Sequence, residues 1–186
     1  MEVTPLEISG VLRIELALHR DWRGRFVELW NDQRYRSAGI GRPFVQDNIS
    51  VSDRGVLRGM HYQFPDGQGK LVSVVHGAVF DVVVDVRHAS PTFGRWIGVE
   101  LSDENGVQLY VPPGCAHGYL VVSERAVFNY KCTGYYSPQH EHTFRWDDPA
   151  VGIAWPTDAP PRLAAKDLDA PLLAAIPAHA LPPMEL

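Results

Sequence analysis

The feature that most limits how this chain can fold is its dense spacing of glycine and proline. Sixteen glycines and fifteen prolines are spread along 186 residues. Both residue types interrupt long helices and weaken the interior of long strands. We therefore expect many short elements joined by tight turns.

Between these turn signals lie short runs rich in valine, isoleucine, leucine and aromatic residues. They predict strands over 44–51, 71–75, 79–86, 96–101, 108–111, 118–122 and 126–132. Alternation along 79–86 places Asp81 and Asp85 on the same face as Val79 and Val83. Many short strands at this spacing are typical of a sandwich or barrel, so the predicted fold class is all-β.

Helical signals are few. A short helix is expected within 29–39, and helical turns are expected within 163–167 and 172–176, where prolines are sparse. Residues 177–186 are rich in proline and alanine and are expected to form a loose tail. No linker or repeat interrupts residues 1–186, so a single domain is expected.

Composition excludes several classes of protein. A hydrophobic content of 45% and a charged content of 21% are typical of globular proteins rather than disordered ones. The net charge of −5 argues against a nucleic-acid partner. The chain shows no membrane-length apolar run and no targeting segment, and Cys115 and Cys132 are too few for a disulfide framework. A cytoplasmic protein with no membrane partner is expected.

Common catalytic motifs are missing from the sequence. It contains no dinucleotide-binding glycine motif after a strand, no P-loop, no C-x-x-C, no H-E-x-x-H and no G-x-S-x-G. Redox-cofactor, nucleotide-hydrolysis and serine-hydrolase functions therefore lack support.

Two histidines lie in surroundings that resemble the two signatures of cupins, which are jelly-roll β-barrels. His117 ends a fit to the second signature over 106–117, and His61 ends a fit to the start of the first over 55–61. In metal-binding cupins the first signature continues with a second histidine and a glutamate, but here those positions hold Gln63 and Lys70.

These departures from the cupin signatures argue against a bound metal ion. The asparagine that closes the second signature is replaced by Val121. A lysine at a ligand position repels a metal, and one or two histidines are too few for a tight site. A histidine that binds no metal can act as a general base, and a lysine in the same pocket can stabilise an oxyanion. The alternative is that neither residue is catalytic: His61 would be a hydrogen-bonded residue of a strand, and Lys70 would be a solvated residue of a turn.

A wider set of stretches resembles the dTDP-4-dehydrorhamnose 3,5-epimerase family. The stretches are DWRGRFVE (21–28), FVQDN (44–48), GVLRGMHYQ (55–63), GKLV (69–72), GAVFDVVVDVR (77–87), SPTFGRW (90–96), PPGCAHGY (112–119), FNYK (128–131), YYSP (135–138), WDDP (146–149) and AKD (165–167). The resemblance implies a cupin-type jelly-roll homodimer that uses no cofactor and no metal. Its implied substrate is a dTDP-linked 4-keto-6-deoxyhexose.

The resemblance also implies catalytic roles. His61 would be the base, oriented by the carboxylate of Asp167, and Tyr130 would be the acid on the opposite face of the sugar. Lys70 would lie beside the C4 oxygen and stabilise the enolate. Removing a proton from one face and adding one to the other is what inverts a carbon.

Further positions correspond to substrate contacts. Arg23, Arg58 and Lys166 would neutralise the diphosphate. The remaining implied contacts, to the thymine, the sugar or both, are Glu28, Gln46, Asp47, Asn48, His117, Tyr136 and Glu141. The alternatives left open are ordinary surface arginines at Arg23 and Arg58 and a strand-shaping role for Asp47.

One geometric conflict calls for a prediction. Arg58 and His61 are three positions apart, so a regular strand would send them to opposite sides. Gly59 lies between them and can host a bulge that resets the alternation. We therefore expect an irregularity at residues 59–60.

The leading expectation is epimerisation at C3 and C5 of dTDP-4-dehydro-6-deoxyglucose, which gives dTDP-4-dehydro-L-rhamnose. A close alternative is a relative that inverts only C3 or only C5. A metal-dependent cupin enzyme and a non-catalytic sugar-nucleotide binder belong to different classes and stay open.

Overall fold

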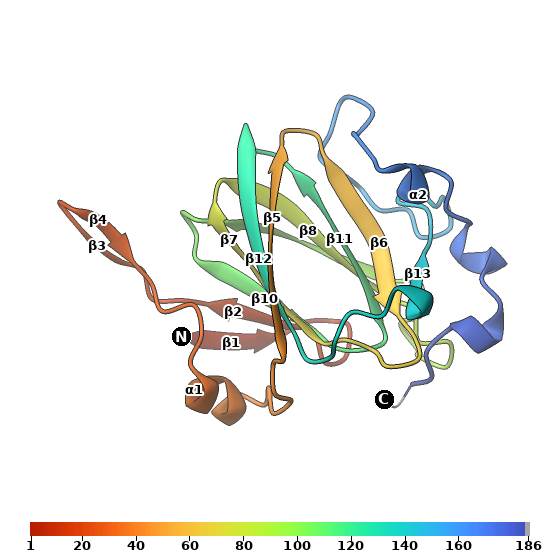
Figure 1. Ribbon diagram of the computed structural model, residues 1–186, viewed down its shortest axis with the longest axis horizontal. Coiled ribbons are helices and arrows are strands. Elements are labelled where there is room, and N and C mark those ends of the chain that lie inside the picture. Colours follow the sequence, from red (N-terminus) through yellow and green to blue (C-terminus); the bar gives the residue numbers. More distant parts are fainter. Residues whose placement is uncertain (185–186) are drawn as a thin grey trace.

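Two antiparallel sheets face one another in the computed structural model, which describes residues 1–184 (Figure 1). The six-stranded sheet has the order β1 (Glu2–Pro5), β2 (Leu12–Glu15), β10 (Val107–Val111), β7 (Lys70–His76), β12 (Arg125–Cys132) and β5 (Gln46–Asp53). The five-stranded sheet has the order β13 (Glu141–Thr143), β6 (Leu57–Gln63), β11 (Cys115–Val121), β8 (Ala78–Asp85) and β9 (Trp96–Ser102). The predicted all-β jelly-roll class is confirmed.

The elements missed by the sequence interpretation are short or polar. They are β1, β2, β6, β13 and the hairpin of β3 (His19–Asp21) with β4 (Gly24–Phe26). Strand β6 carries arginine, glycine, histidine and glutamine, so it lacks the apolar run that marks the other strands of its sheet. The helices α1 (Asp32–Ser37) and α2 (Ala165–Leu168) overlap their expected ranges, as does the 3₁₀ turn η2 (Leu173–Ala175), and η1 (Pro138–His140) and η3 (Ala178–Ala180) complete the set.

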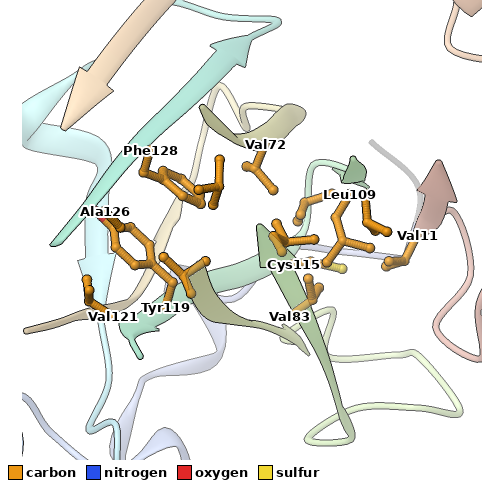
Figure 2. Close-up of a cluster of buried hydrophobic side chains, with 14 of the residues drawn as sticks. Val11, Val72, Val83, Leu109, Cys115, Tyr119, Val121, Ala126 and Phe128 are labelled. Carbon is orange, nitrogen blue, oxygen red and sulfur yellow. The ribbon is translucent and has the colours of Figure 1, made fainter. Parts of the chain in front are cut away.

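The main hydrophobic core lies between the two sheets (Figure 2). Val72, Leu109 and Phe128 come from the six-stranded sheet, and Val83 and Tyr119 come from the five-stranded sheet. All five are at most 5% exposed. Alternate residues of each strand point inward, which is why the period-two pattern of the sequence located this core.

The C-terminal third covers the outer face of the five-stranded sheet. Val82 and Val84 pack there in a second cluster with Phe144, Leu173 and Leu181. Residues 180–182 are buried, so this part of the expected loose tail is packed, whereas residues 177–179 and Met184 are exposed, and residues 185–186 lie outside the described residues. Burial against an apolar sheet face holds a proline-rich segment that cannot form long helices of its own.

The irregularity expected beside Gly59 is present. His61 pairs with His117 and Arg58 pairs with Tyr119, so three steps along β6 match two along β11. The peptide bond that follows Gly59 is cis. The extra residue shifts the alternation, and both Arg58 and His61 face the same cavity.

The β3–β4 hairpin extends away from the two sheets (Figure 1). Trp22 at its tip is 94% exposed and Phe26 is 69% exposed. None of the helices in residues 1–184 has the length and apolarity needed to cross a membrane.

Candidate active site

A cavity of about 620 Å³ lies between the two sheets. Strands β5, β7 and β12 line one side, β6 and β11 line the other, and residues 162–167 contribute to the wall. The predicted site residues that it brings together are His61, Tyr130, Asp167, Lys70, Gln46, Asn48, Arg58, His117, Tyr136, Glu141 and Lys166.

His61 and Asp167 form a tight pair. Nε2 of His61 lies 2.6 Å from Oδ1 of Asp167, whose side chain is 2% exposed. The backbone N–H of Gly59 donates to the other carboxylate oxygen at 3.5 Å. A buried carboxylate on one ring nitrogen fixes the orientation of the imidazole, and the other ring nitrogen is left to accept a proton, as a general base requires.

Tyr130 lines the same cavity as His61 but comes from the other sheet. Its hydroxyl makes no hydrogen bond with the residues that the structure describes, although it lines the cavity. Burial raises the pKa of Tyr130, and Cys132 and Tyr119 add to this effect while Arg58 opposes it. The phenol therefore keeps its proton at neutral pH and has it available to donate.

Lys70 begins β7 and lines the same cavity. Burial lowers the pKa of its ammonium group, and the nearby Cys132, Glu141 and Asp81 oppose that shift. A partly desolvated cation stabilises a developing negative charge more strongly than a cation in water.

His117, which lines the cavity, forms a second histidine–aspartate pair with Asp81. Nε2 of His117 lies 2.8 Å from Oδ2 of Asp81, which is fully buried. Burial raises the pKa of Asp81 above its usual value, and the interactions with His117 and Lys70 offset only part of this rise. Asp85, on the same face of β8, instead pairs with Arg87. The place of Asp81 beside Val79 and Val83 on an inward face was the available signal.

Polar side chains line the cavity near β13. Lys166 Nζ lies 2.8 Å from Glu141 Oε2, and the Tyr136 hydroxyl donates to the same oxygen at 3.2 Å. Burial alone would raise the pKa of Glu141, but its interactions with Lys166, His61 and Tyr136 outweigh this effect and hold the pKa below its usual range. Gln46 accepts from the Tyr136 backbone at 2.9 Å and donates to Asn48 at 3.0 Å.

Three predicted substrate-binding residues lie outside this cavity. Asp47 projects away from it, because neighbouring side chains on β5 alternate, and it binds Lys131 and Asn129. Arg23 lies at the hairpin tip and pairs with Asp21. Glu28 pairs with Arg34 of α1 at 2.9 Å.

Some cavity residues were missed by sequence reasoning. Ser52 does not line the cavity itself, but it holds the predicted residue Arg58, since its Oγ accepts from Nε at 3.2 Å and from Nη2 at 3.1 Å. Tyr119 and Ser50 share a hydroxyl–hydroxyl contact of 2.7 Å. Arg162 reaches the cavity from a loop with no strand pattern. Serine, tyrosine and a loop arginine carry no sequence signal that separates a cavity position from a surface one.

The residues at the cupin metal positions do not fit a metal ion. Lys70 stands where a carboxylate ligand would be needed. The side-chain amide of Gln63 binds neighbouring loops, since it donates to the backbone carbonyl of Asp66 at 2.5 Å and accepts from the Ser137 N–H at 2.9 Å. Within residues 1–184 no group of three or more His, Cys, Asp or Glu side chains converges as metal ligands would.

Comparisons with known proteins agree with this geometry. The family model described as dTDP-4-dehydrorhamnose 3,5-epimerase matches residues 5–175. The dTDP-4-dehydrorhamnose 3,5-epimerase of Salmonella typhimurium is 51% identical over 176 residues, which are 93% of this chain and 96% of that one.

Solved structures are equally similar. The dTDP-6-deoxy-D-glucose-3,5-epimerase of Legionella pneumophila, in complex with dTDP-4-keto-L-rhamnose, has a TM-score of 0.96 at 47% identity, covering 100% of this chain and 99% of that one. ChmJ, a 3′-monoepimerase from Streptomyces bikiniensis in complex with dTDP-quinovose, has a TM-score of 0.90 at 42% identity, covering 96% and 92%. The chain therefore belongs to the dTDP-4-dehydrorhamnose 3,5-epimerase family.

Proposed function

We propose that this protein epimerises dTDP-4-dehydro-6-deoxyglucose at C3 and C5 and gives dTDP-4-dehydro-L-rhamnose. The observation that carries the proposal is the opposition of His61 and Tyr130 across one cavity, one from each sheet. Inverting a carbon needs a base on one face of the sugar ring and an acid on the other.

The proton transfers balance without a cofactor. His61 takes the proton from the carbon next to the C4 ketone through the ring nitrogen that does not bind Asp167. The electron pair moves to the C4 oxygen, and the ammonium of Lys70 stabilises the resulting enolate. Tyr130 then donates its proton to the carbon from the opposite face, and solvent restores both residues. C3 and C5 both adjoin the ketone, so the same residues serve both carbons in turn.

A second candidate is inversion at one carbon only. The similarity to a 3′-monoepimerase favours it, since that relative has the same fold at 42% identity. The same base and acid would act there, and the pose of the sugar would decide which carbon is reached.

The proposal includes a homodimer in which the β3–β4 hairpin reaches the partner. Trp22 and Phe26 leave a large apolar area uncovered on the hairpin, and Ile49 and Val51 do so on β5. A second copy would cover both areas. The hairpin would also carry Arg23, which lies outside its own chain's cavity, to the diphosphate in the partner's cavity.

A cytoplasmic location is also part of the proposal. Cys115 and Cys132 are both free and buried, which suits a reducing compartment.

Incubation with the substrate in deuterated water tests the function. Deuterium at C3 and C5 with inversion at both supports the double epimerase, and label at one carbon supports the single one. Absence of exchange while dTDP still binds would indicate a non-catalytic binder. Activity that is lost with a stoichiometric metal and restored by it would indicate a metal enzyme instead.

A further inference from the structure

Arg162 is fixed beside β6 by its backbone. Its N–H donates to the Gly55 carbonyl at 2.7 Å, and its carbonyl accepts from the Leu57 N–H at 3.0 Å. These bonds form a parallel bridge in which Arg162 pairs with Val56. Val56 and Arg58 are two positions apart on one strand edge, so Arg162 and Arg58 belong to the same side, and both line the cavity.

The side chain of Arg162 is available to a ligand. It is exposed, and its guanidinium makes no hydrogen bond or ion pair with residues 1–184. Arg58 donates only to the neutral hydroxyl of Ser52. The two arginines therefore place two uncompensated positive charges at one wall of the cavity.

The other cations of the cavity are committed elsewhere. Lys166 is paired with Glu141 at 2.8 Å. Lys70 is partly buried on β7 of the opposite sheet. Within one chain, the cations left for a doubly charged anion are Arg58 and Arg162, and arginine binds phosphate oxygens through paired N–H groups.

We propose that Arg162 is a phosphate-binding residue that holds, together with Arg58, the diphosphate of the sugar nucleotide. This inference rests on the proposed function for the identity of the ligand. The backbone bridge gives Arg162 a fixed starting point, so less conformational freedom is lost when it binds than for an arginine on a mobile loop.

Calorimetric titration with dTDP and with inorganic pyrophosphate tests the inference. Arg162→Gln should weaken both ligands by roughly tenfold or more, the loss expected when a charge-assisted hydrogen bond to a phosphate is removed. Arg162→Lys keeps the positive charge but loses the paired N–H groups, so its affinity for both ligands should lie between those of the unaltered protein and Arg162→Gln. KM for the dTDP-sugar should rise by the same factor, while kcat at saturation stays within about twofold, since the residue does not act at the sugar carbons.

Arg54→Gln is the matched control. Arg54 is exposed and lies outside the cavity, and its loss changes the net charge equally. Wild-type affinity for dTDP and pyrophosphate in Arg162→Gln would overturn the inference, as would an equal loss in Arg54→Gln or no binding of either ligand to the unaltered protein. Deuterium exchange in the unaltered protein judges the proposed function separately, so either claim can fail while the other stands.

Discussion

His61 and Tyr130 line one cavity from opposing sheets, His61 on β6 and Tyr130 on β12. Neither strand pairs with the other, so the space between them is set by how the two sheets pack. A rigid core on one side of the cavity thus fixes the separation of base and acid. The two groups can therefore act on opposite faces of a ring that enters between the sheets.

The pairing of His61 with Asp167 predicts a graded loss of proton abstraction. His61→Asn should abolish deuterium exchange at both sugar carbons, and Asp167→Asn should slow it by ~10²–10⁴-fold, because the imidazolium loses its stabilising charge. Exchange is measured by mass spectrometry of the recovered sugar nucleotide. His88→Asn is the control, because His88 is exposed and outside the cavity. Full exchange in His61→Asn would remove the histidine from the mechanism.

Tyr130→Phe should separate exchange from inversion. Without the phenol, the enolate still forms on the His61 side and can take its proton back from that side. We expect net epimerisation to fall by ~10²–10⁴-fold while exchange with solvent falls less. The two rates are measured on one sample by product analysis and isotope content. Equal losses in both would mean that Tyr130 acts before or during proton abstraction.

The fall of kcat at high pH should result from the loss of the proton on Lys70. Burial lowers the pKa of Lys70, so its ammonium loses its proton below the ordinary value of ~10.4, whereas burial raises the pKa of Tyr130 above ~10. Both shifts bring forward the loss of charge on Lys70 relative to the ionisation of Tyr130, so we assign the fall of kcat with rising pH to Lys70. Lys70→Arg should move this fall to higher pH, and Lys70→Gln should lower kcat by ~10²–10³-fold at neutral pH. A fall of kcat at an unchanged pH in Lys70→Arg would contradict the assignment.

The proposed reach of Arg23 into a partner's cavity predicts complementation. Arg23→Gln and His61→Asn proteins should each be impaired as homodimers. In a mixed dimer, one cavity combines an intact His61 from one chain with an intact Arg23 from the other, so activity should return on co-expression. No recovery in purified mixed dimers would place Arg23 outside the partner's site.

The exposed residues of β5 predict where the dimer should break. Ile49→Lys with Val51→Lys should give a monomer, since two charges would have to be buried in the interface. Sedimentation velocity measures the mass. Leu172→Lys, on the segment that covers the other sheet, is the control and should leave the mass unchanged. A dimer that survives the β5 changes would contradict the proposed interface.

The sequence predicted those strands and site residues that leave a local pattern, and it missed those whose positions depend on tertiary packing. Apolar alternation located strands such as β8 and β12 because burial on an inward face leaves a period of two. Strand β6 escaped, although it carries His61, because its inward residues must contact a ligand as well as the core. Arg162 and Ser50 enter the cavity through tertiary packing alone, so no local pattern marks them. The burial of residues 180–182 depends on an apolar sheet face elsewhere in the chain.

Substitution of Gly59 should lower the stability of the fold strongly. Its φ of +139° is rarely adopted by other residues, and a Cβ there would lie 2.6 Å from the Cα of Gly118 on β11. Backbone atoms cannot move aside cheaply, so Gly59→Ala should lower the free energy of unfolding by roughly 3 kcal/mol or more in urea titrations. Gly39→Ala is the control, with a φ of +93° and open space around its Cβ, and should cost only about 1 kcal/mol. Because the N–H of Gly59 also donates to Asp167, the Gly59→Ala protein that still folds should lose activity as well. If Gly59→Ala and Gly39→Ala were equally stable, the backbone contact between Gly59 and Gly118 would not limit the packing of β6 against β11.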